Sequence, residues 1–359
     1  PDAWLKSPER TSITAELADI QRTAPTIYTS DENGPAREFS TSIWYQTWEV
    51  YKRLNLIWWR DPYYTYGLLC QSIICGLALA FTFYKIKDSS SDLDQLMFLL
   101  LELLFMGILY VYLVLPQFLI QKEYFKRDYA SKFYSWFPFA ICIVLVEIPY
   151  AIGFGSLCFI MLYWTCGFDY RLDSVESVYF WLIFVVFVLF MCTFGHVVAS
   201  VCLTAFLSFT VLPVMVGILF SFSGVMVPYE RMPVFWRSWI YKLNPAQYLL
   251  EGVITNALRD LTVQCSPQDF LQFPPPSGLT CEQYAYDFQS DANNLGYIST
   301  LDNGNCGYCK YKTGKEYYET VLSWSDDNRW RNLGVLISFW VFNIFMVILF
   351  IYLTRKAQR

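Results

Sequence analysis

Four cysteines could carry chemistry, because they lie apart from the other cysteines of the chain. Of the 11 cysteines, Cys265, Cys281, Cys306 and Cys309 fall in one polar stretch, and the rest lie in apolar segments. The Cys306-Gly-Tyr-Cys309 spacing could bind a metal or exchange disulfides, but a zinc site needs four ligands and the only histidine is in an apolar segment. We therefore expect two structural disulfides and no metal site. Several pairings are open; we favour Cys265 with Cys281 and Cys306 with Cys309.

Ionisable residues inside apolar segments are the next candidates, because such side chains face protein or a water-filled cavity in a bilayer. Glu147 lies just before Pro149, which removes a helical hydrogen bond and kinks the helix. For Glu147 we predict a structural bond to a neighbouring helix in preference to proton transport. For His196 we predict an interhelical hydrogen bond in preference to a role as ligand or switch.

Bulky residues on two apolar segments could line a transport path. Those of the first segment recur at three- and four-residue spacing and therefore share one helical face; they are Phe98, Glu102, Phe105, Leu109 and Tyr112. The second segment has a similar surface formed by Phe209, Leu212, Met215, Phe220 and Phe222. Packing between helices is the alternative explanation. The carboxylate of Glu102 favours a cavity, because an ionisable group avoids lipid.

The composition indicates an integral membrane protein. Hydrophobic residues form 55% of the chain and charged residues 16%, against about 45–50% and about 25% in soluble domains. Each of the apolar stretches is about as long as the ~20 residues that cross a bilayer; they occupy residues 62–84, 93–121, 134–166, 178–206, 208–227 and 333–354. We predict an all-α fold with six transmembrane helices.

Lysine and arginine predict the orientation, because the cytoplasmic side of a membrane protein carries their excess. They gather before the first span, after the second and after the last, at Lys52, Arg53, Arg60, Lys122, Lys126, Arg127, Lys132, Arg355, Lys356 and Arg359. Both ends of the chain are then cytosolic, and the cysteine-bearing loop 228–330 lies outside. Much of the net charge of −5 falls in that loop, so it calls for no nucleic-acid partner.

A charged and aromatic segment, residues 121–132, follows the second span. Its spacing predicts a short helix with a polar and an aromatic face, formed by Lys122, Glu123, Tyr124, Phe125, Arg127, Asp128 and Tyr129. Such a helix could contact another domain. An interfacial helix with snorkelling lysine and arginine side chains is the alternative.

The N-terminal part precedes the first span. Residues 1–37 are polar and begin with Pro1, so we expect a piece of a longer protein, with a helix near Ser12 to Arg22 and a linker from Thr29 to Pro35. Residues 38–60 are amphipathic and rich in tryptophan, as in a helix that lies in the membrane interface.

Several segments resemble, in the same order, those of the fungal pleiotropic-drug-resistance transporters, full-length members of the G-type ABC family. They are REFSTSIWYQTWEVYKRLNLIWWRDPYY, QKEYFKRDYASKFYS with EIPY, FSGVMVPYERMPVFWRSWIYKLNPAQYLLEGV, CGYCKY and RWRNLG. The resemblance covers nearly the whole chain. The short CxxC followed by RWRN resembles the second, C-terminal membrane domain of these proteins.

The resemblance implies a division into functional parts. Residues 1–37 would be the tail of a nucleotide-binding domain, 38–60 the connecting helix and 121–132 the coupling helix that receives nucleotide-domain motion. Residues 61–227 would hold spans one to five, 228–330 a re-entrant segment and the outer loop, and 331–359 the last span. The Arg127-Asp128 pair stands where many relatives carry Arg-Glu, so the shorter acid puts its reach to a partner in question. Second and fifth helices of both halves would line a central cavity.

The resemblance also implies an ATP-driven exporter of hydrophobic drugs in the plasma membrane. Its partners would be a first membrane domain and two nucleotide-binding domains of the same polypeptide. The chain has no GxxxxGK[ST] phosphate loop, HExxH or GxSxG motif, so we expect no ATP hydrolysis by this chain, with ATP and Mg²⁺ bound in the nucleotide-binding domains. A lipid or sterol translocator of the same fold is the alternative, and an ATP-independent channel or receptor ranks below both.

Overall fold

Long helices account for most of the chain. The computed structural model describes residues 4, 7–28, 39, 41–86, 88–202, 204–276, 279–291, 294–301 and 304–355. They fall into two units, Pro1–Ser42 and Ile43–Arg359. The first unit contains α2 (Pro8–Tyr28), which confirms the helix predicted near Ser12 to Arg22. The predicted linker from Thr29 to Pro35, Lys356 and Arg359 lie outside the described residues.

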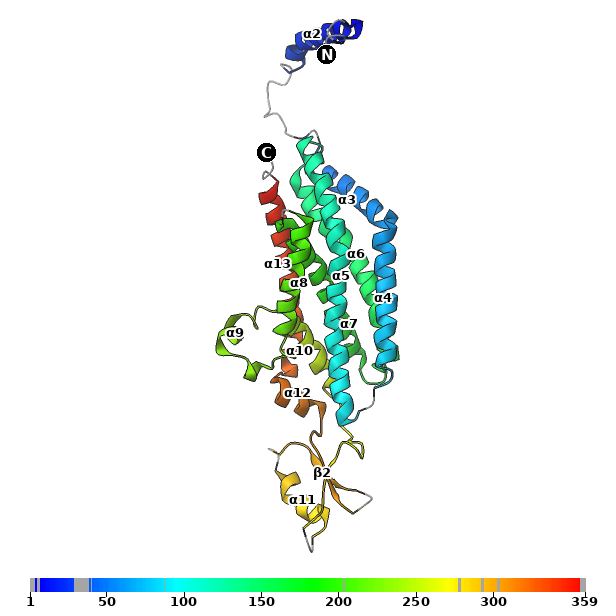
Figure 1. Ribbon diagram of the computed structural model, residues 1–359, viewed down its shortest axis with the longest axis vertical. Helices are drawn as coiled ribbons and strands as arrows, with labels where there is room; N and C mark the ends of the chain where they lie inside the picture. The colour runs from blue at the N-terminus through cyan, green and yellow to red at the C-terminus, as the bar shows by residue number, and fades with distance from the viewer. Residues whose placement is uncertain are drawn as a thin grey trace. The chain divides into compact units, whose positions relative to one another are not determined.

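The second unit is built on a bundle in which α7 is the central helix. α7 is buried along most of its length and packs against α5, α6, α10 and α13. Figure 1 shows the long helices lying alongside one another. The helices of the bundle are α4 (Pro62–Thr82), α5 (Ser90–Ala130), α6 (Trp136–Thr165), α7 (Ser174–Val201), α8 (Ala205–Ser221) and α13 (Arg329–Thr354).

Among the described residues, five helices are long and apolar enough to cross a bilayer, namely α4, α5, α6, α7 and α13. The predicted fifth span corresponds to α8, which has 17 residues and therefore lies at the lower end of the range that spans a bilayer, roughly 17–25 residues. α8 ends before Gly224, whose φ of 90° leaves the helical region.

The amphipathic segment before the first span forms α3 (Ile43–Arg60). Its buried residues recur every four positions, as Gln46, Val50, Leu54 and Trp58, while Trp44 and Trp59 are exposed. This pattern confirms the predicted amphipathic helix. Its buried face packs on α6.

The second span and the predicted coupling helix form one continuous helix, α5, of 41 residues. At about 1.5 Å per residue, α5 is about 60 Å long, roughly twice the ~30 Å hydrocarbon core of a bilayer. Part of α5 therefore extends beyond the hydrocarbon core, and its charged residues are concentrated in the last turns. The helix ends where the Ser131 N–H donates to Arg127 and Lys132 takes a φ of 59°.

The segment after α8 contains shorter elements and ends in a small domain, which we call the outer domain after its predicted location outside the membrane. It begins with η1 (Tyr229–Arg231), α9 (Val234–Trp239) and α10 (Pro245–Leu258). α9 has no buried residue, whereas α10 is buried along nearly all of its length and packs on α13 and α7.

The outer domain is a three-stranded antiparallel sheet of order β1-β3-β2 with flanking helices. The elements are β1 (Leu271–Phe273), α11 (Cys281–Ser290), β2 (Tyr297–Thr300), β3 (Cys306–Cys309) and α12 (Gly314–Leu322). The hydroxyl of Tyr317 donates to Asp94 at 2.7 Å and so ties this domain to α5. Burial raises the pKa of Tyr317 and the neighbouring carboxylate raises it further, which keeps the hydroxyl protonated as a donor.

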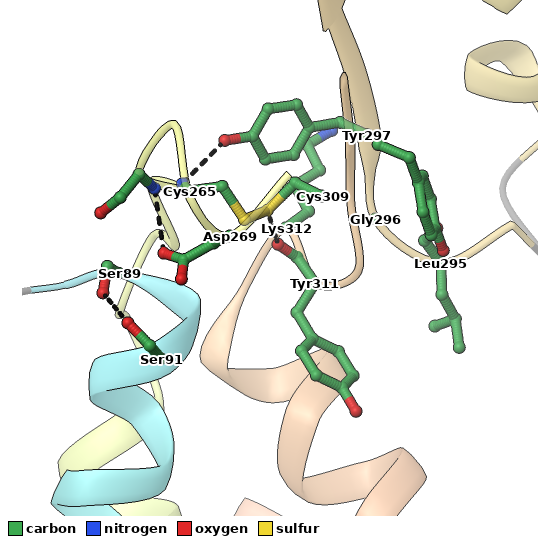
Figure 2. The surroundings of a disulfide bond; sticks show 12 residues. Ser89, Ser91, Cys265, Asp269, Leu295, Gly296, Tyr297, Cys309, Tyr311 and Lys312 are labelled. Atoms are coloured by element: carbon green, nitrogen blue, oxygen red, sulfur yellow. Dashed lines mark hydrogen bonds between the residues drawn. A yellow bond between two sulfur atoms is a disulfide. The ribbon is translucent and has the colours of Figure 1, made fainter. Parts of the chain in front are cut away.

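The outer domain holds two disulfides, as predicted, but the favoured pairing is wrong. The bonds join Cys265 to Cys309 and Cys281 to Cys306. Cys306 and Cys309 lie in one extended strand, where about 3.3 Å per residue separates their Cα atoms by about 10 Å, beyond the ~7 Å that a disulfide can bridge. Figure 2 shows the first bond, beside which the Cys265 N–H donates to the Tyr297 hydroxyl at 3.1 Å. Since both cysteines of the CxxC pair form disulfides, neither is a thiolate ligand.

Candidate functional site

The bulky face predicted on α5 is the face that the rest of the chain leaves uncovered. Phe98 is 55% exposed, Phe105 38% and Leu109 37%, and Glu102 and Tyr112 are half-buried. The residues between them are almost all buried in the bundle. The helical spacing therefore places one aromatic stripe, with a single carboxylate, on the surface of α5.

The predicted surface of α8 is only partly exposed. Phe209 and Met215 are exposed and Phe220 and Phe222 are half-buried. Leu212 is fully buried, because it shares the inward face of α8 with Ser208 and Val216, four residues away on either side. The placement of Leu212 among the path residues is therefore wrong.

The two surfaces meet at one aromatic contact. The rings of Phe105 and Phe220 have centroids 4.9 Å apart, and α5 packs against α8 along this part of the bundle. The contact joins the stripe of α5 to the C-terminal end of α8. Exposed aromatic, leucine and methionine side chains of this kind can contact varied hydrophobic molecules.

The C-terminal end of α5 is tied to α3 by a buried carboxylate. The side chain of Asp128 is 6% exposed, and it accepts from Arg53 at 2.7 Å and from Arg127 at 3.3 Å. Arg53 also donates to the Tyr134 hydroxyl at 2.9 Å. Asp128 thus reaches a partner despite being one methylene shorter than glutamate, and the partner comes from α3.

The predicted coupling residues divide into a buried and an exposed set. Lys122 is buried and donates to the carbonyls of Ala199, Ser200 and Cys202 at 2.8, 3.1 and 2.9 Å. These carbonyls lie at the end of α7, where helical partners are lacking, so Lys122 caps α7. Phe125 is buried and stacks on Phe139 with centroids 4.4 Å apart.

The exposed set of the same helix end contains one acid, one aromatic residue and one base. The side chains of Glu123 and Arg127 are 68% and 72% exposed, and Tyr124 is also exposed. The guanidinium of Arg127 lies over the Tyr124 ring, 5.6 Å from its centroid. Tyr129 is half-buried. These outward side chains form the surface of α5 that another domain can contact.

Glu147 joins three helices. It is almost fully buried, and its carboxylate accepts from the Trp58 indole at 2.8 Å and from the Tyr64 hydroxyl. Trp58 belongs to α3 and Tyr64 to α4. The predicted bond to a neighbouring helix is confirmed, and it fixes the α3–α4 junction to α6, a helix that continues through Pro149.

We expect Glu147→Ala to lower the yield of folded protein severalfold. Two buried donors would lose their acceptor, at about 1–3 kcal/mol each. Thermal unfolding of the purified full-length protein measures the effect. Glu147→Gln keeps one acceptor oxygen and should lose less stability than Glu147→Ala. Equal stability of the alanine variant and the parent would contradict the structural role.

His196 differs from its prediction. Neither ring nitrogen has a hydrogen-bond partner among the residues that the structure describes. The ring instead lies against Phe118 of α5, with centroids 4.9 Å apart. The predicted interhelical hydrogen bond is wrong; the residue joins α7 to α5 by aromatic packing.

A buried polar network that the sequence did not predict lies around the start of α13. Glu251 accepts from Gln247 at 2.6 Å and from Asn328 at 3.2 Å. Arg329 donates to Asn256 at 2.9 Å and lies 3.8 Å from Glu176. The signal was available, since Glu176 and Glu251 each adjoin an apolar stretch and an acid there calls for a partner. The network joins α10 and α7 to the start of α13.

The chain is similar to known membrane transporters. Residues 45–258 match the family model described as ABC-2 type transporter, and residues 309–359 match the one described as CDR ABC transporter. The chain is 52% identical over its whole length to "ABC transporter G family member 14" of Dictyostelium discoideum, of which it covers 25%. It is 32% identical over 99% of its length to "ABC multidrug transporter atrF" of Aspergillus flavus, of which it covers 23%. The chain thus spans about a quarter of the length of these relatives.

Proposed function

The chain belongs to the ABC-2 type transporter family, and from this premise we propose that it is the membrane-spanning half of an ATP-driven exporter of hydrophobic compounds. ATP and Mg²⁺ bind to nucleotide-binding domains of the same polypeptide, which also holds the first membrane domain. A relative that carries the name multidrug transporter supports a drug-like cargo.

One observation carries this proposal, namely the exposed bulky face of α5 and its aromatic contact with α8. No other part of the chain that the structure describes covers Phe98, Phe105 and Leu109, which are exposed. The ring of Phe105 contacts that of Phe220. In the whole protein this surface faces the second and fifth helices of the first membrane domain, and the two surfaces together line a central cavity. Aromatic side chains bind apolar molecules there without strict geometry.

The end of α5 converts nucleotide-domain motion into movement of the bundle. Its exposed Glu123, Tyr124 and Arg127 contact a nucleotide-binding domain, and the Asp128–Arg53 ion pair carries the displacement to α3. Closure of the nucleotide domains on ATP then pushes the continuous α5 helix and closes the inward-facing cavity. Cargo leaves on the other side, as in alternating access.

The exporter lies in the plasma membrane with both ends of the chain in the cytosol. The two disulfides support an outside location for the domain that contains β1 to β3, because disulfides persist in oxidising surroundings. Basic residues at the opposite end of the bundle, such as Arg53, Lys126 and Arg355, support a cytosolic location for that end.

We expect Phe98→Ala and Phe105→Ala to weaken efflux of a fluorescent hydrophobic dye from cells that express the full-length protein. An aromatic contact contributes about 0.5–1.5 kcal/mol, so the apparent affinity should fall roughly 2- to 10-fold for each variant. Phe342→Ala is the matched control, because Phe342 of α13 is 56% exposed and Phe98 55% but Phe342 lies outside the α5–α8 surface.

Surface expression of each variant is measured alongside efflux. Loss of efflux in the two α5 variants, with Phe342→Ala unchanged, supports the path. Equal loss of efflux in all three variants would contradict the proposed path, as would dye export that none of the variants alters. If dye stays in the cell while labelled lipid or sterol crosses the bilayer, the lipid translocator replaces the drug exporter.

A further inference from the structure

A cavity of about 680 Å³ opens between the ends of three helices. Its lining comes from the last turns of α5, from Phe139 near the start of α6 and from the last turns of α13. Figure 1 shows the end of α5 and the end of α13 at the same end of the bundle. In the orientation proposed above, this is the level of the inner-leaflet headgroups.

The lining of the cavity is cationic. Lys122, Lys126, Lys132 and Arg355 all line it, and none of the described residues that line it is acidic. Lys122 is held by the carbonyls of α7. Lys126 pairs with Glu123 at 2.7 Å, but the Glu123 side chain is 68% exposed and is not part of the cavity lining. Like charges gathered in one cavity repel each other, so a bound anion would be stabilised there.

Arg355 is positioned by aromatic rings. Its guanidinium lies 3.9 Å from the centroid of the Tyr352 ring and 5.3 Å from that of Trp136, and the two rings contact each other with centroids 5.0 Å apart. Among the described residues, no carboxylate is within ion-pair distance of Arg355. A tryptophan and a tyrosine at this level are typical of the membrane–water interface.

Part of the cavity lining is apolar. Phe125, Phe139 and Ile351 belong to this part and are buried. A cavity lined by both cations and apolar side chains matches a ligand that has an anionic group joined to a hydrocarbon chain. Inorganic phosphate would contact the cations but would leave the apolar part of the lining unused. Basic pockets between membrane helices at the cytoplasmic side bind the headgroups of anionic lipids.

We propose that this cavity binds the headgroup phosphate of an anionic phospholipid, with Lys126, Lys132 and Arg355 around the phosphate and Ile351 beside the acyl chain. The lipid joins the end of α13 to the end of α5. Because α5 also carries the proposed coupling surface, the lipid content of the inner leaflet sets how firmly that surface is held. The inference rests on the proposed orientation but not on the identity of the cargo.

The test is lipid binding by the purified full-length protein without ATP, so that failure of the transport proposal does not affect it. Thermal unfolding is measured in detergent with added phosphatidylserine, phosphatidylcholine or inorganic phosphate. We expect phosphatidylserine alone to raise the unfolding temperature. Arg355→Ala and Lys126→Ala should each raise the half-saturating concentration of phosphatidylserine about fivefold, as expected for the loss of one basic residue near an anionic lipid.

Lys52→Ala is the matched control. Lys52 pairs with Glu49 at 2.7 Å, as Lys126 does with Glu123, but it lies on α3 outside the cavity. The Lys52→Ala variant should bind phosphatidylserine with the same half-saturating concentration as the parent protein. Ala130→Trp provides a variant that keeps every charge, since Ala130 is exposed and lines the cavity; the added ring should fill the cavity and abolish the stabilisation.

Each remaining outcome overturns the proposal. Equal stabilisation by phosphatidylcholine would mean that the cations play no part. Equal stabilisation by inorganic phosphate would make the ligand a soluble anion. Unchanged phosphatidylserine binding in Ala130→Trp and Arg355→Ala would place the lipid elsewhere on the protein.

Discussion

Asp128→Asn is expected to lower ATP-dependent transport by the full-length protein at least about tenfold while most of the protein still reaches the cell surface. The substitution keeps the size of the side chain but removes the charge that Arg53 contacts at 2.7 Å. Arg53 is 40% exposed, so solvent screens the pair and the loss of stability should stay at about 1–2 kcal/mol. The larger effect falls on coupling, because the pair joins α5 to α3. ATP hydrolysis should persist without transport.

The matched control for this prediction is Glu49→Gln. The Lys52–Glu49 pair has the same 2.7 Å distance, but both side chains are almost half-exposed, and such pairs contribute about 0–1 kcal/mol. We expect full transport from this variant. Transport is measured per molecule of surface protein. Normal transport by Asp128→Asn, or a loss that only follows its surface amount, would refute the coupling role.

The second large effect is expected from loss of the disulfides of the outer domain. The Cys265–Cys309 and Cys281–Cys306 bonds join residues 44 and 25 positions apart. In the chain-entropy model, loops of these lengths give about 4 and about 3.5 kcal/mol of stability. The small sheet around Cys306 and Cys309 has little other core, so replacing both cysteines of either bond by serine should prevent most of the protein from reaching the surface.

Cys70→Ser is the control for the disulfide variants, because Cys70 is a free and exposed cysteine. It should leave surface expression unchanged. Peptide mapping of the unreduced protein tests the pairing itself. A peptide that links Cys306 to Cys309, or Cys265 to Cys281, would contradict the structure, as would normal surface expression of both double variants.

Hydropathy predicts the long helices well because a spanning helix must be apolar over about 20 residues. It did not predict that α5 continues through Gln121 into the charged segment. The side chains change from apolar to charged there, but no glycine or proline follows before Ser131, and nothing in the backbone ends the helix. Polarity marks the membrane boundary, while the helix ends at the turn around Lys132.

The partners of the site residues could not be predicted from spacing. Asp128 bonds to a residue 75 positions away and Glu147 to one 89 positions away, so the helix arrangement decides these pairs. The α5 stripe was predictable, since helical periodicity alone places Phe98, Phe105 and Leu109 on one face. Leu212 was misplaced because apolar residues surround α8 on all sides and its buried face even contains Ser208, so periodicity does not tell which face is buried.

The most direct test of the exporter is transport into inside-out membrane vesicles that contain the full-length protein. A hydrophobic fluorescent dye and labelled phospholipid are followed separately, with ATP and with a non-hydrolysable analogue. We predict that the dye accumulates only with ATP, and that accumulation disappears with Asp128→Asn but persists with Glu49→Gln. Dye movement that is equal with and without hydrolysis, or ATP-dependent movement of lipid but not of dye, would contradict the proposed function.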